Sequence, residues 1–85
     1  MNWQISVASH ARKQLKRVPA ADRDRIERAV DEMGQDPFRG DIERMSGQEK
    51  SWRRRIGAYR IFYEIFTDQR IIRISDIRRR TSKTY

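Results

Sequence analysis

Cysteine is absent from this chain of 85 residues, and histidine occurs only at His10. Without cysteine the chain has neither disulfides nor thiolate metal ligands, and a single imidazole cannot form a histidine cluster. No apolar run approaches the length that spans a membrane, and the first residues do not follow the pattern of a signal peptide. We therefore expect a cytoplasmic protein with no metal site and no cofactor.

Acidic residues are scarce in one part of the chain. Residues 51–85 contain three Asp or Glu against ten Lys or Arg, whereas residues 1–50 contain nine against ten. Most of the formal net charge of +8 therefore belongs to the C-terminal part. Such a concentration is typical of proteins that bind a polyanion, either nucleic acid or an acidic protein segment. Nine of these ten cations are arginines, whose planar guanidinium suits phosphate better than the point charge of lysine does.

The N-terminal half predicts a strand, two helices and a loop within a single domain. The segment "WQISVA" predicts a strand over residues 3 to about 8, and Ser9 is the expected N-cap of a helix that Pro19 ends. A second helix is predicted from residue 20 to about 33, with Gly34 as its stop. The segment "QDPFRGDIERMSG" predicts a connecting loop, from which Ile42 and Met45 reach the core.

From Trp52 onward the apolar residues alternate with a period of two. The segments "SWRRRI", "YRIFYEIF" and "IIRISDI" predict three strands, joined by "GA" and "TDQR". The expected fold class is therefore α+β, with an N-terminal strand, two helices and a three-stranded antiparallel meander.

The two-residue loop at Gly57 and Ala58 predicts the register, because it places Arg55 directly opposite Arg60. The other expected pairs are Ile56 with Tyr59, Arg54 with Ile61, Arg53 with Phe62, Glu64 with Arg73, Phe62 with Ser75, and Ala58 with Arg79. One face is then apolar and covers the helices, while the other carries Phe62, Glu64, Arg53, Arg55, Arg60, Arg73 and Arg79. Opposed like charges cost up to about 1 kcal/mol, so we expect an anion to bind there.

Three charged residues of these strands have an ordinary structural interpretation. We expect Glu64 and Arg73 to form a cross-strand ion pair. We expect the stem of Arg54 to cover the core while its head reaches water.

The stretch "RRRIGAYRIFYEI", preceded by a loop that ends in "MSG" and followed by "ISDIRRRTSKTY", resembles the RelE/ParE superfamily of bacterial type II toxins. The resemblance covers nearly the whole chain and implies one RelE-like toxin domain over residues 1–85. In the RelE branch it implies an mRNA interferase, a ribosome-dependent endoribonuclease that cleaves mRNA in the A site and is neutralised by a wrapping antitoxin. The ParE branch shares the fold but poisons DNA gyrase.

The resemblance also implies which residues form the site. Two basic positions of the first meander strand fall on Arg53 and Arg55, and the arginine after the Gly-any-Tyr step falls on Arg60. The last-strand arginine falls on Arg79, with Arg80 as the alternative. The closing tyrosine of the pattern is Tyr85.

RNA carries its own nucleophile, the 2′-hydroxyl, so metal-independent cleavage to a 2′,3′-cyclic phosphate needs alignment, proton transfer and charge stabilisation. We expect Arg55 and Arg60 to bracket the scissile phosphate and Arg79 to support the leaving group. Arg53 would hold a neighbouring phosphate, and Tyr85 would move a proton or stack on a base. Further RNA contacts are expected from Arg54, Arg73, Arg78, Arg80 and Lys83.

Three functions remain open at this point: a ribonuclease toxin, a toxin that binds gyrase or another protein, and an inactive RelE-like regulator. The ribonuclease uses the aligned arginines and Tyr85, whereas the second function needs only the fold and an exposed helical surface. The expected partners are mRNA in the ribosomal A site, ribosomal RNA, and a cognate antitoxin with an acidic or amphipathic segment.

Overall fold

The structure, a computed structural model, describes residues 3–45, 47 and 50–79. In these ranges it contains the helices α1 (Ser9–Lys16) and α2 (Ala20–Gln35) and the strands β1 (Gln4–Val7), β2 (Ile42–Arg44), β3 (Ser51–Ile56), β4 (Tyr59–Phe66) and β5 (Ile71–Arg79). The strand order is β1-β5-β4-β3-β2, with β1 parallel to β5 and the other neighbours antiparallel. The predicted α+β class and the meander of β3, β4 and β5 are confirmed.

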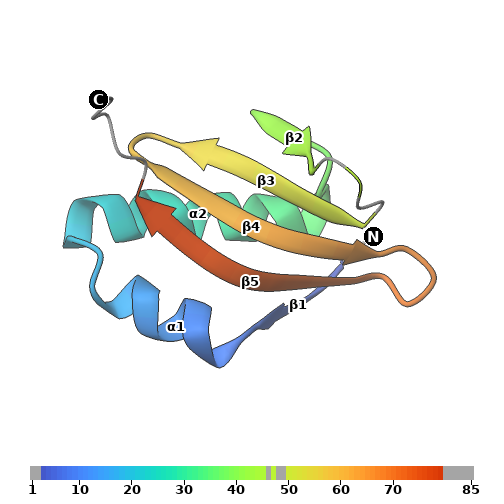
Figure 1. The fold of residues 1–85 in the computed structure, drawn as a ribbon, viewed down its shortest axis with the longest axis horizontal. Coiled ribbons are helices and arrows are strands. Elements are labelled where there is room, and N and C mark those ends of the chain that lie inside the picture. Colours follow the sequence, from blue (N-terminus) through green and yellow to red (C-terminus); the bar gives the residue numbers. More distant parts are fainter. Residues whose placement is uncertain (1–2, 46, 48–49, 80–85) are drawn as a thin grey trace.

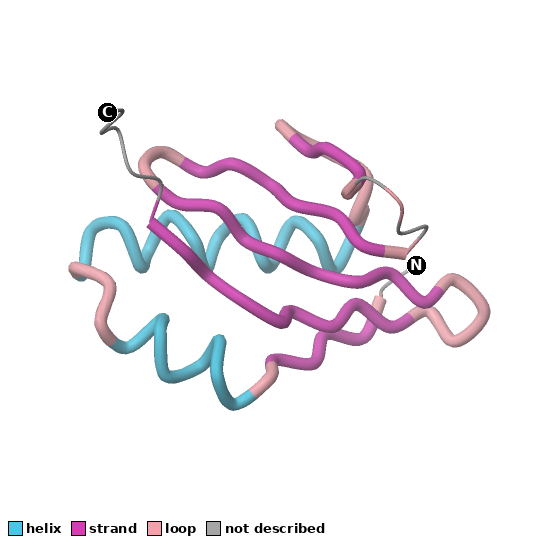
Figure 2. The backbone as a smooth tube through the Cα atoms, in the orientation of Figure 1, coloured by secondary structure: helices cyan, strands magenta, loops and turns pink. Residues whose placement is uncertain are grey.

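The helices cover one face of the sheet and one of its edges. In Figure 1, α2 passes behind the strands, and α1 lies beside β5, beyond the end of β1. Ile26 and Met33 of α2 pack in the core with apolar side chains of β4 and β5. No helix of the described part of the chain covers the opposite face, which is turned toward the viewer in Figure 2. None of the helices in the described ranges is long and apolar enough to cross a membrane.

The alternation of β4 explains why the sheet has one apolar face. Tyr59, Ile61, Tyr63 and Ile65 are buried on the helix side, while the residues between them are half-buried on the other side. Successive strand side chains point to opposite faces, so the core takes the apolar set and leaves the polar set outside. We call the second surface of β3, β4 and β5 the outer face.

The helix boundaries differ from the expected ones in two places. Ser9 is already helical, and Ala8 is the N-cap, with no side-chain hydrogen bond, so the predicted Ser9 cap is wrong. Gly34 lies inside α2 and does not stop it. The helix ends at Gln35, and its C-cap is Asp36, whose extended backbone is what a residue before Pro37 prefers.

The predicted loop after α2 contains β2, a strand that the sequence did not reveal. Ile42, Glu43 and Arg44 pair antiparallel with β3, and Ile42 packs against the core as expected. The segment before β2 is held by Tyr63, whose hydroxyl donates a 3.1 Å hydrogen bond to the carbonyl of Pro37. Burial raises the pKa of this hydroxyl to about 12, against the opposing charge of Arg54.

The β4–β5 register changes at Ser75. The pairing of Glu64 with Arg73 is confirmed, but Phe62 pairs with Asp76, so the predicted partner Ser75 is wrong. Ser75 is the extra residue of a β-bulge, and its hydroxyl donates to the carbonyl of Phe62 at 3.2 Å.

The bulge reverses which residues of β5 face the helices. A strict period of two would place Asp76 toward the core and Ile77 outside, whereas the bulge buries Ile77 to 4% exposure. Burying a full isoleucine side chain stabilises by about 1.5–3 kcal/mol, and burying an unpaired carboxylate is unfavourable. The exchange therefore favours the bulged register.

Candidate nucleic-acid interface

Three arginines form a row across the outer face. Arg55 of β3 pairs with Arg60 of β4, as predicted, and Arg60 pairs with Arg78 of β5. We call Arg55, Arg60 and Arg78 the arginine row. Directly opposed residues on one face have Cβ atoms about 4.5–5.5 Å apart, so the three arginine side chains start from neighbouring positions on the sheet.

The predicted place of Arg79 in this row is wrong. Arg79 pairs with the core residue Tyr59, where the sequence predicted Ala58. Because Tyr59 points to the helix side, Arg79 shares that side, although its position at the strand end leaves it exposed. The bulge at Ser75 thus puts Arg78 opposite Arg60.

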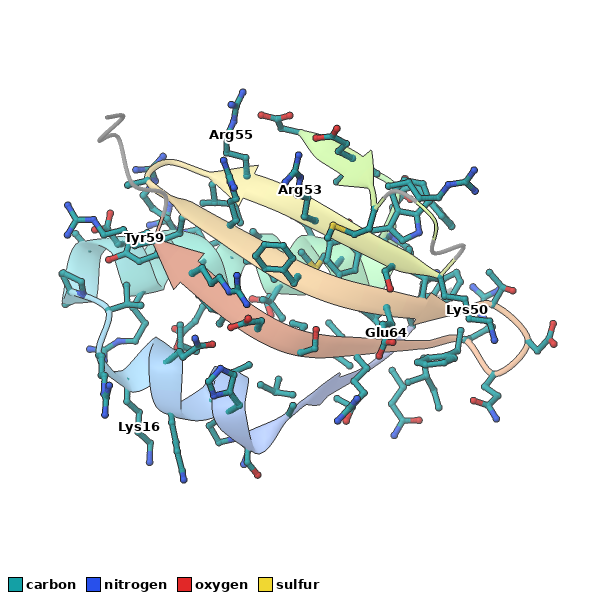
Figure 3. The ribbon with its side chains drawn as sticks, viewed as in Figure 1. Lys16, Lys50, Arg53, Arg55, Tyr59 and Glu64 are labelled. Atoms are coloured by element: carbon teal, nitrogen blue, oxygen red, sulfur yellow. The ribbon has the colours of Figure 1, made fainter. Side chains whose placement is uncertain are left out.

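Two carboxylates from the segment of β2 neutralise part of the arginine surface. The Nη2 of Arg53 lies 2.6 Å from Oε1 of Glu43, and Nε of Arg53 donates to the same oxygen at 3.2 Å. The Nε of Arg55 donates to Oδ2 of Asp41 at 2.9 Å. Arg53 and Arg55 rise side by side from β3, on the flank where β2 lies (Figure 3).

Arg60 differs from its neighbours in the row. No carboxylate of the described residues forms an ion pair with Arg60, whereas Arg55 is paired with Asp41 and Arg78 with Asp76. A cavity of about 150 Å³ opens beside it, lined by Asp41, Glu43, Arg53, Arg55 and Arg60. With three guanidinium groups and two carboxylates, the cavity has a net positive formal charge. Arg60 is its one arginine that no described carboxylate pairs, so an anion can bind there.

At the other end of the row, Asp76 orients Arg78. The Nε of Arg78 donates to Oδ2 of Asp76 at 2.7 Å, and the guanidinium lies 5.3 Å from the centre of the Phe62 ring. Partial burial would raise the pKa of Asp76, but hydrogen bonds from Arg78 and Gln14 and the charges of Arg78 and His10 hold it below its usual range. Arg78 is therefore fixed in direction while its side chain remains 68% exposed.

The N-terminal helix completes this end of the face. The backbone N–H of Ile77 donates to Oε1 of Gln14 at 2.7 Å, so α1 satisfies the edge of β5 beyond β1. The Nε2 of His10 lies 3.4 Å from Oδ1 of Asp76, a buried oxygen with no hydrogen-bond partner among the described residues.

Arg54 lies on the opposite side of the sheet from the arginine row. Its side chain is 11% exposed, with Nη2 2.6 Å from Oε1 of Glu32 and Nη1 donating to the carbonyl of Ala29. The hydrogen bond and the charge of Arg54 lower the pKa of Glu32. The stem of Arg54 covers the core as predicted, but its head binds α2 instead of reaching water, so Arg54 lies on the opposite face from the arginine row and its predicted RNA contact stays a prediction.

The remaining predicted residues divide into two groups. Arg73 lies on the outer face, one row beyond Phe62, with Nη1 3.6 Å from Oε1 of Glu64, so the predicted cross-strand ion pair is confirmed. Arg80, Lys83 and Tyr85 lie outside the described residues. Their roles stay predictions.

The sequence interpretation missed Asp41 and Glu43, although a signal was present. In "DIERM" the acidic residues flank Ile42 with a period of two, as on a strand with one apolar and one charged face. The run of arginines in "SWRRR" has the complementary charge. Pairing the two segments would have placed Glu43 opposite Arg53, as observed.

Known proteins share this fold and part of this sequence. A family model described as "ParE toxin of type II toxin-antitoxin system, parDE" matches residues 5–83. A protein of Methanocaldococcus jannaschii named "Putative toxin RelE1" is 29% identical over 83 residues, covering 94% of this chain and 92% of that protein. The RelB–RelE antitoxin–toxin complex from Methanococcus jannaschii contains a chain 27% identical to this one, with a TM-score of 0.74 and coverage of 87% and 88%.

More distant structures agree in fold. A chain of the archaeal RelE–RelB complex from Pyrococcus horikoshii OT3 superposes with a TM-score of 0.85 at 22% identity, covering 98% of this chain and all of that one. The isolated E. coli RelE toxin superposes with a TM-score of 0.84 at 11% identity, covering 95% of this chain and 87% of that one. Since the family match spans nearly the whole chain and the fold is that of RelE toxins, this protein belongs to the ParE toxin family of type II toxin–antitoxin systems, within the RelE/ParE superfamily.

Proposed function

We propose that this toxin is an endoribonuclease that cleaves mRNA in the ribosomal A site and thereby inhibits translation. The observation that carries the proposal is the arginine row on an uncovered sheet face, next to a cavity that also contains two carboxylates. Cleavage by a 2′-hydroxyl needs cationic donors for the phosphate and a proton acceptor within the same site. The cavity contains both.

Arg55 and Arg60 are positioned to hold the scissile phosphate. The 2′-oxygen would attack phosphorus, forming the 2′,3′-cyclic phosphate while the bond from phosphorus to the 5′-oxygen breaks. Charge then develops on the phosphoryl oxygens, where guanidinium donors stabilise it more than they stabilise the ground state. Arg78, oriented by Asp76 and Phe62, extends the same donor set toward β5.

Glu43 and Asp41 are the candidate proton acceptors. In Glu43 both hydrogen bonds from Arg53 go to Oε1, and no described residue donates to Oε2. A carboxylate held by an arginine and open on one oxygen can take the proton of the 2′-hydroxyl. The proton for the departing 5′-oxygen is the role still predicted for Tyr85.

Related structures support a cognate antitoxin as partner. The complexes from Pyrococcus horikoshii and Mycobacterium tuberculosis are described as RelE with RelB and as the toxin–antitoxin complex RelBE2. An acidic antitoxin segment would compete with mRNA for the arginine row, since Arg60 has no ion pair within the described ranges and would accept either anion.

Gyrase inhibition is the second candidate, because the matching family model is described as a ParE toxin. Primer extension on mRNA from cells that express the chain separates the two functions. We expect cuts in register with the reading frame for the wild type and none for Arg60→Gln. Double-strand DNA breaks without mRNA cuts would contradict the ribonuclease proposal and favour gyrase.

The role of the carboxylates is tested by single-turnover cleavage of mRNA on a programmed ribosome. Glu43→Gln keeps an oxygen that accepts from Arg53 but cannot take a proton, so a general base at this position predicts a rate loss of about 10² to 10⁴. Asp41→Asn tests the other carboxylate, and Asp68→Asn in the exposed β4–β5 turn is the charge-matched control. Wild-type rates for both Glu43→Gln and Asp41→Asn would place the base outside the cavity.

A further inference from the structure

The guanidinium of Arg25 in α2 lies against the β3–β4 turn, close to the backbone of Gly57. A Cβ at Gly57 would come within 2.9 Å of Nη1 and 3.2 Å of Cζ of Arg25, and Gly57 has a φ of +56°. The guanidinium therefore rests on the backbone of the turn that joins Arg55 to Arg60. No described residue forms an ion pair with Arg25, in contrast to Arg28, whose Nη2 lies 2.6 Å from Asp24 Oδ2.

A second cavity, of about 430 Å³, opens at this position between α2 and β3. Its charged lining consists of Arg25, Arg28, Arg54, Arg55, Glu32 and Asp41. Arg54 is paired with Glu32 and Arg55 with Asp41, so two of the four cations are already neutralised within the cavity. Arg28 is paired with Asp24, so Arg25 is the cation in this lining that no described residue pairs. An anion could bind to Arg25 here, as one could bind to Arg60 in the cavity of the outer face.

The two cavities meet at one ion pair. Arg55 and Asp41 line both of them, so the cation of Arg55 separates the cavity beside Arg60 from the one beside Arg25. A single RNA strand with one phosphate between Arg55 and Arg60 would cross the end of β3 and reach α2. The positive charges of Arg60, Arg55 and Arg25 therefore follow one another from the outer face, past the end of β3, to α2.

We propose that Arg25, assisted by Arg28, binds a backbone phosphate of the RNA that flanks the cleaved position. The inference rests on the proposed function in taking RNA as the ligand. The contact is to phosphate, so it adds affinity and positions the strand without selecting a base. The surface of the toxin that holds RNA therefore extends from the sheet, around the β3–β4 turn, to α2.

The test is binding of a fluorescent single-stranded RNA of about ten nucleotides, measured by anisotropy over a series of salt concentrations. All its 2′-oxygens carry methyl groups, so binding is measured without cleavage. Each phosphate contact to a single strand contributes about 0.7 to the slope of log K against log salt. We expect Arg25→Gln to lower the slope by about that amount. Lys16→Gln, on a side chain that points away from β3 and its arginines (Figure 3), should leave it unchanged.

A second variant separates this inference from the proposed function. Arg60→Gln should lower the slope by the same amount through the first cavity. A reduced slope for Arg60→Gln with a wild-type slope for Arg25→Gln would overturn the second site and leave the proposed function standing. A reduced slope for Arg25→Gln alone would support the site and contradict RNA binding at the arginine row. Wild-type slopes for both variants would overturn both.

Discussion

Replacing Arg60 should make the free protein more stable while removing its activity. Arg60 has a like charge on each side, Arg55 on β3 and Arg78 on β5. A directly opposed like-charged pair destabilises a sheet by roughly 0.2–1 kcal/mol. Both neighbours already have acidic partners, so we take the low end of that range, about 0.25 kcal/mol, for each pair and expect Arg60→Gln to gain about 0.5 kcal/mol in total. For a domain of this size that is a rise in Tm of about 2–4 °C.

Urea unfolding followed by tryptophan fluorescence measures this gain, with an unchanged m-value as the sign that the folded state is the same. The matched control is Arg60→Lys, which keeps the charge and should give no gain. The gain should also disappear near 1 M salt, where the screening length falls to about 3 Å. Arg73→Gln provides the opposite case, because it breaks the ion pair with Glu64 and should leave stability unchanged or slightly lower.

Two results would refute this reasoning. If Arg60→Gln were destabilised by more than about 1 kcal/mol, its side chain would be a structural element of the sheet, contrary to the like-charge argument. If Arg60→Lys raised the free energy of unfolding as much as Arg60→Gln does, the gain would come from removing the bulky guanidinium group and not from removing its charge. In either case a loss of cleavage in Arg60→Gln would no longer identify a phosphate-binding group.

Two further predictions concern stability. Tyr63→Phe removes the hydrogen bond to the carbonyl of Pro37 and leaves a buried acceptor unpaired. We therefore expect urea unfolding to show a free energy of unfolding lower by about 1–3 kcal/mol. A loss below about 0.5 kcal/mol would contradict the anchoring of the segment before β2 by Tyr63. Asp76 has a lowered pKa in the folded state, so it stabilises the fold above its usual pKa of 3.8, and this contribution is lost as the pH falls through the folded pKa. The wild type should therefore be more stable than Asp76→Asn at pH 6, with the difference shrinking below about pH 4; a difference independent of pH between 6 and 3 would exclude the charged carboxylate as its source.

The first hairpin could be predicted residue by residue because its register depends on local chemistry. Gly57 adopts the positive φ that the tight turn requires, and the alternation of β4 leaves one way to bury Ile61 and Tyr63. The opposition of Arg55 and Arg60 follows from these local facts. The ion pair of Glu64 with Arg73 could also be predicted from the sequence, because it lies between the β4–β5 turn and the bulge, where the register still follows the turn.

The bulge at Ser75 could not be predicted, because it depends on competition between residues that lie far apart before folding. Whether Asp76 or Ile77 enters the core is decided by the space that α1 and α2 leave there and by partners such as Gln14 and Arg78. A one-residue change of register exchanges the two faces of a strand. That exchange moved Arg78 into the arginine row and Arg79 out of it.

The sequence by itself determined the class of fold, the meander and the concentration of positive charge, because these depend on composition, alternation and turn residues. The family followed from the resemblance of the stretch "RRRIGAYRIFYEI" and its flanks to known toxins. Only the tertiary structure decided how that charge is distributed. It paired Arg53 with Glu43 of β2 and Arg55 with Asp41 just before that strand, bound Arg54 to α2, and left Arg25 and Arg60 without an ion pair among the described residues. The physical reason is that an ion pair depends on distances of a few ångströms between segments that only folding brings together, whereas alternation and charge content are properties of neighbouring residues.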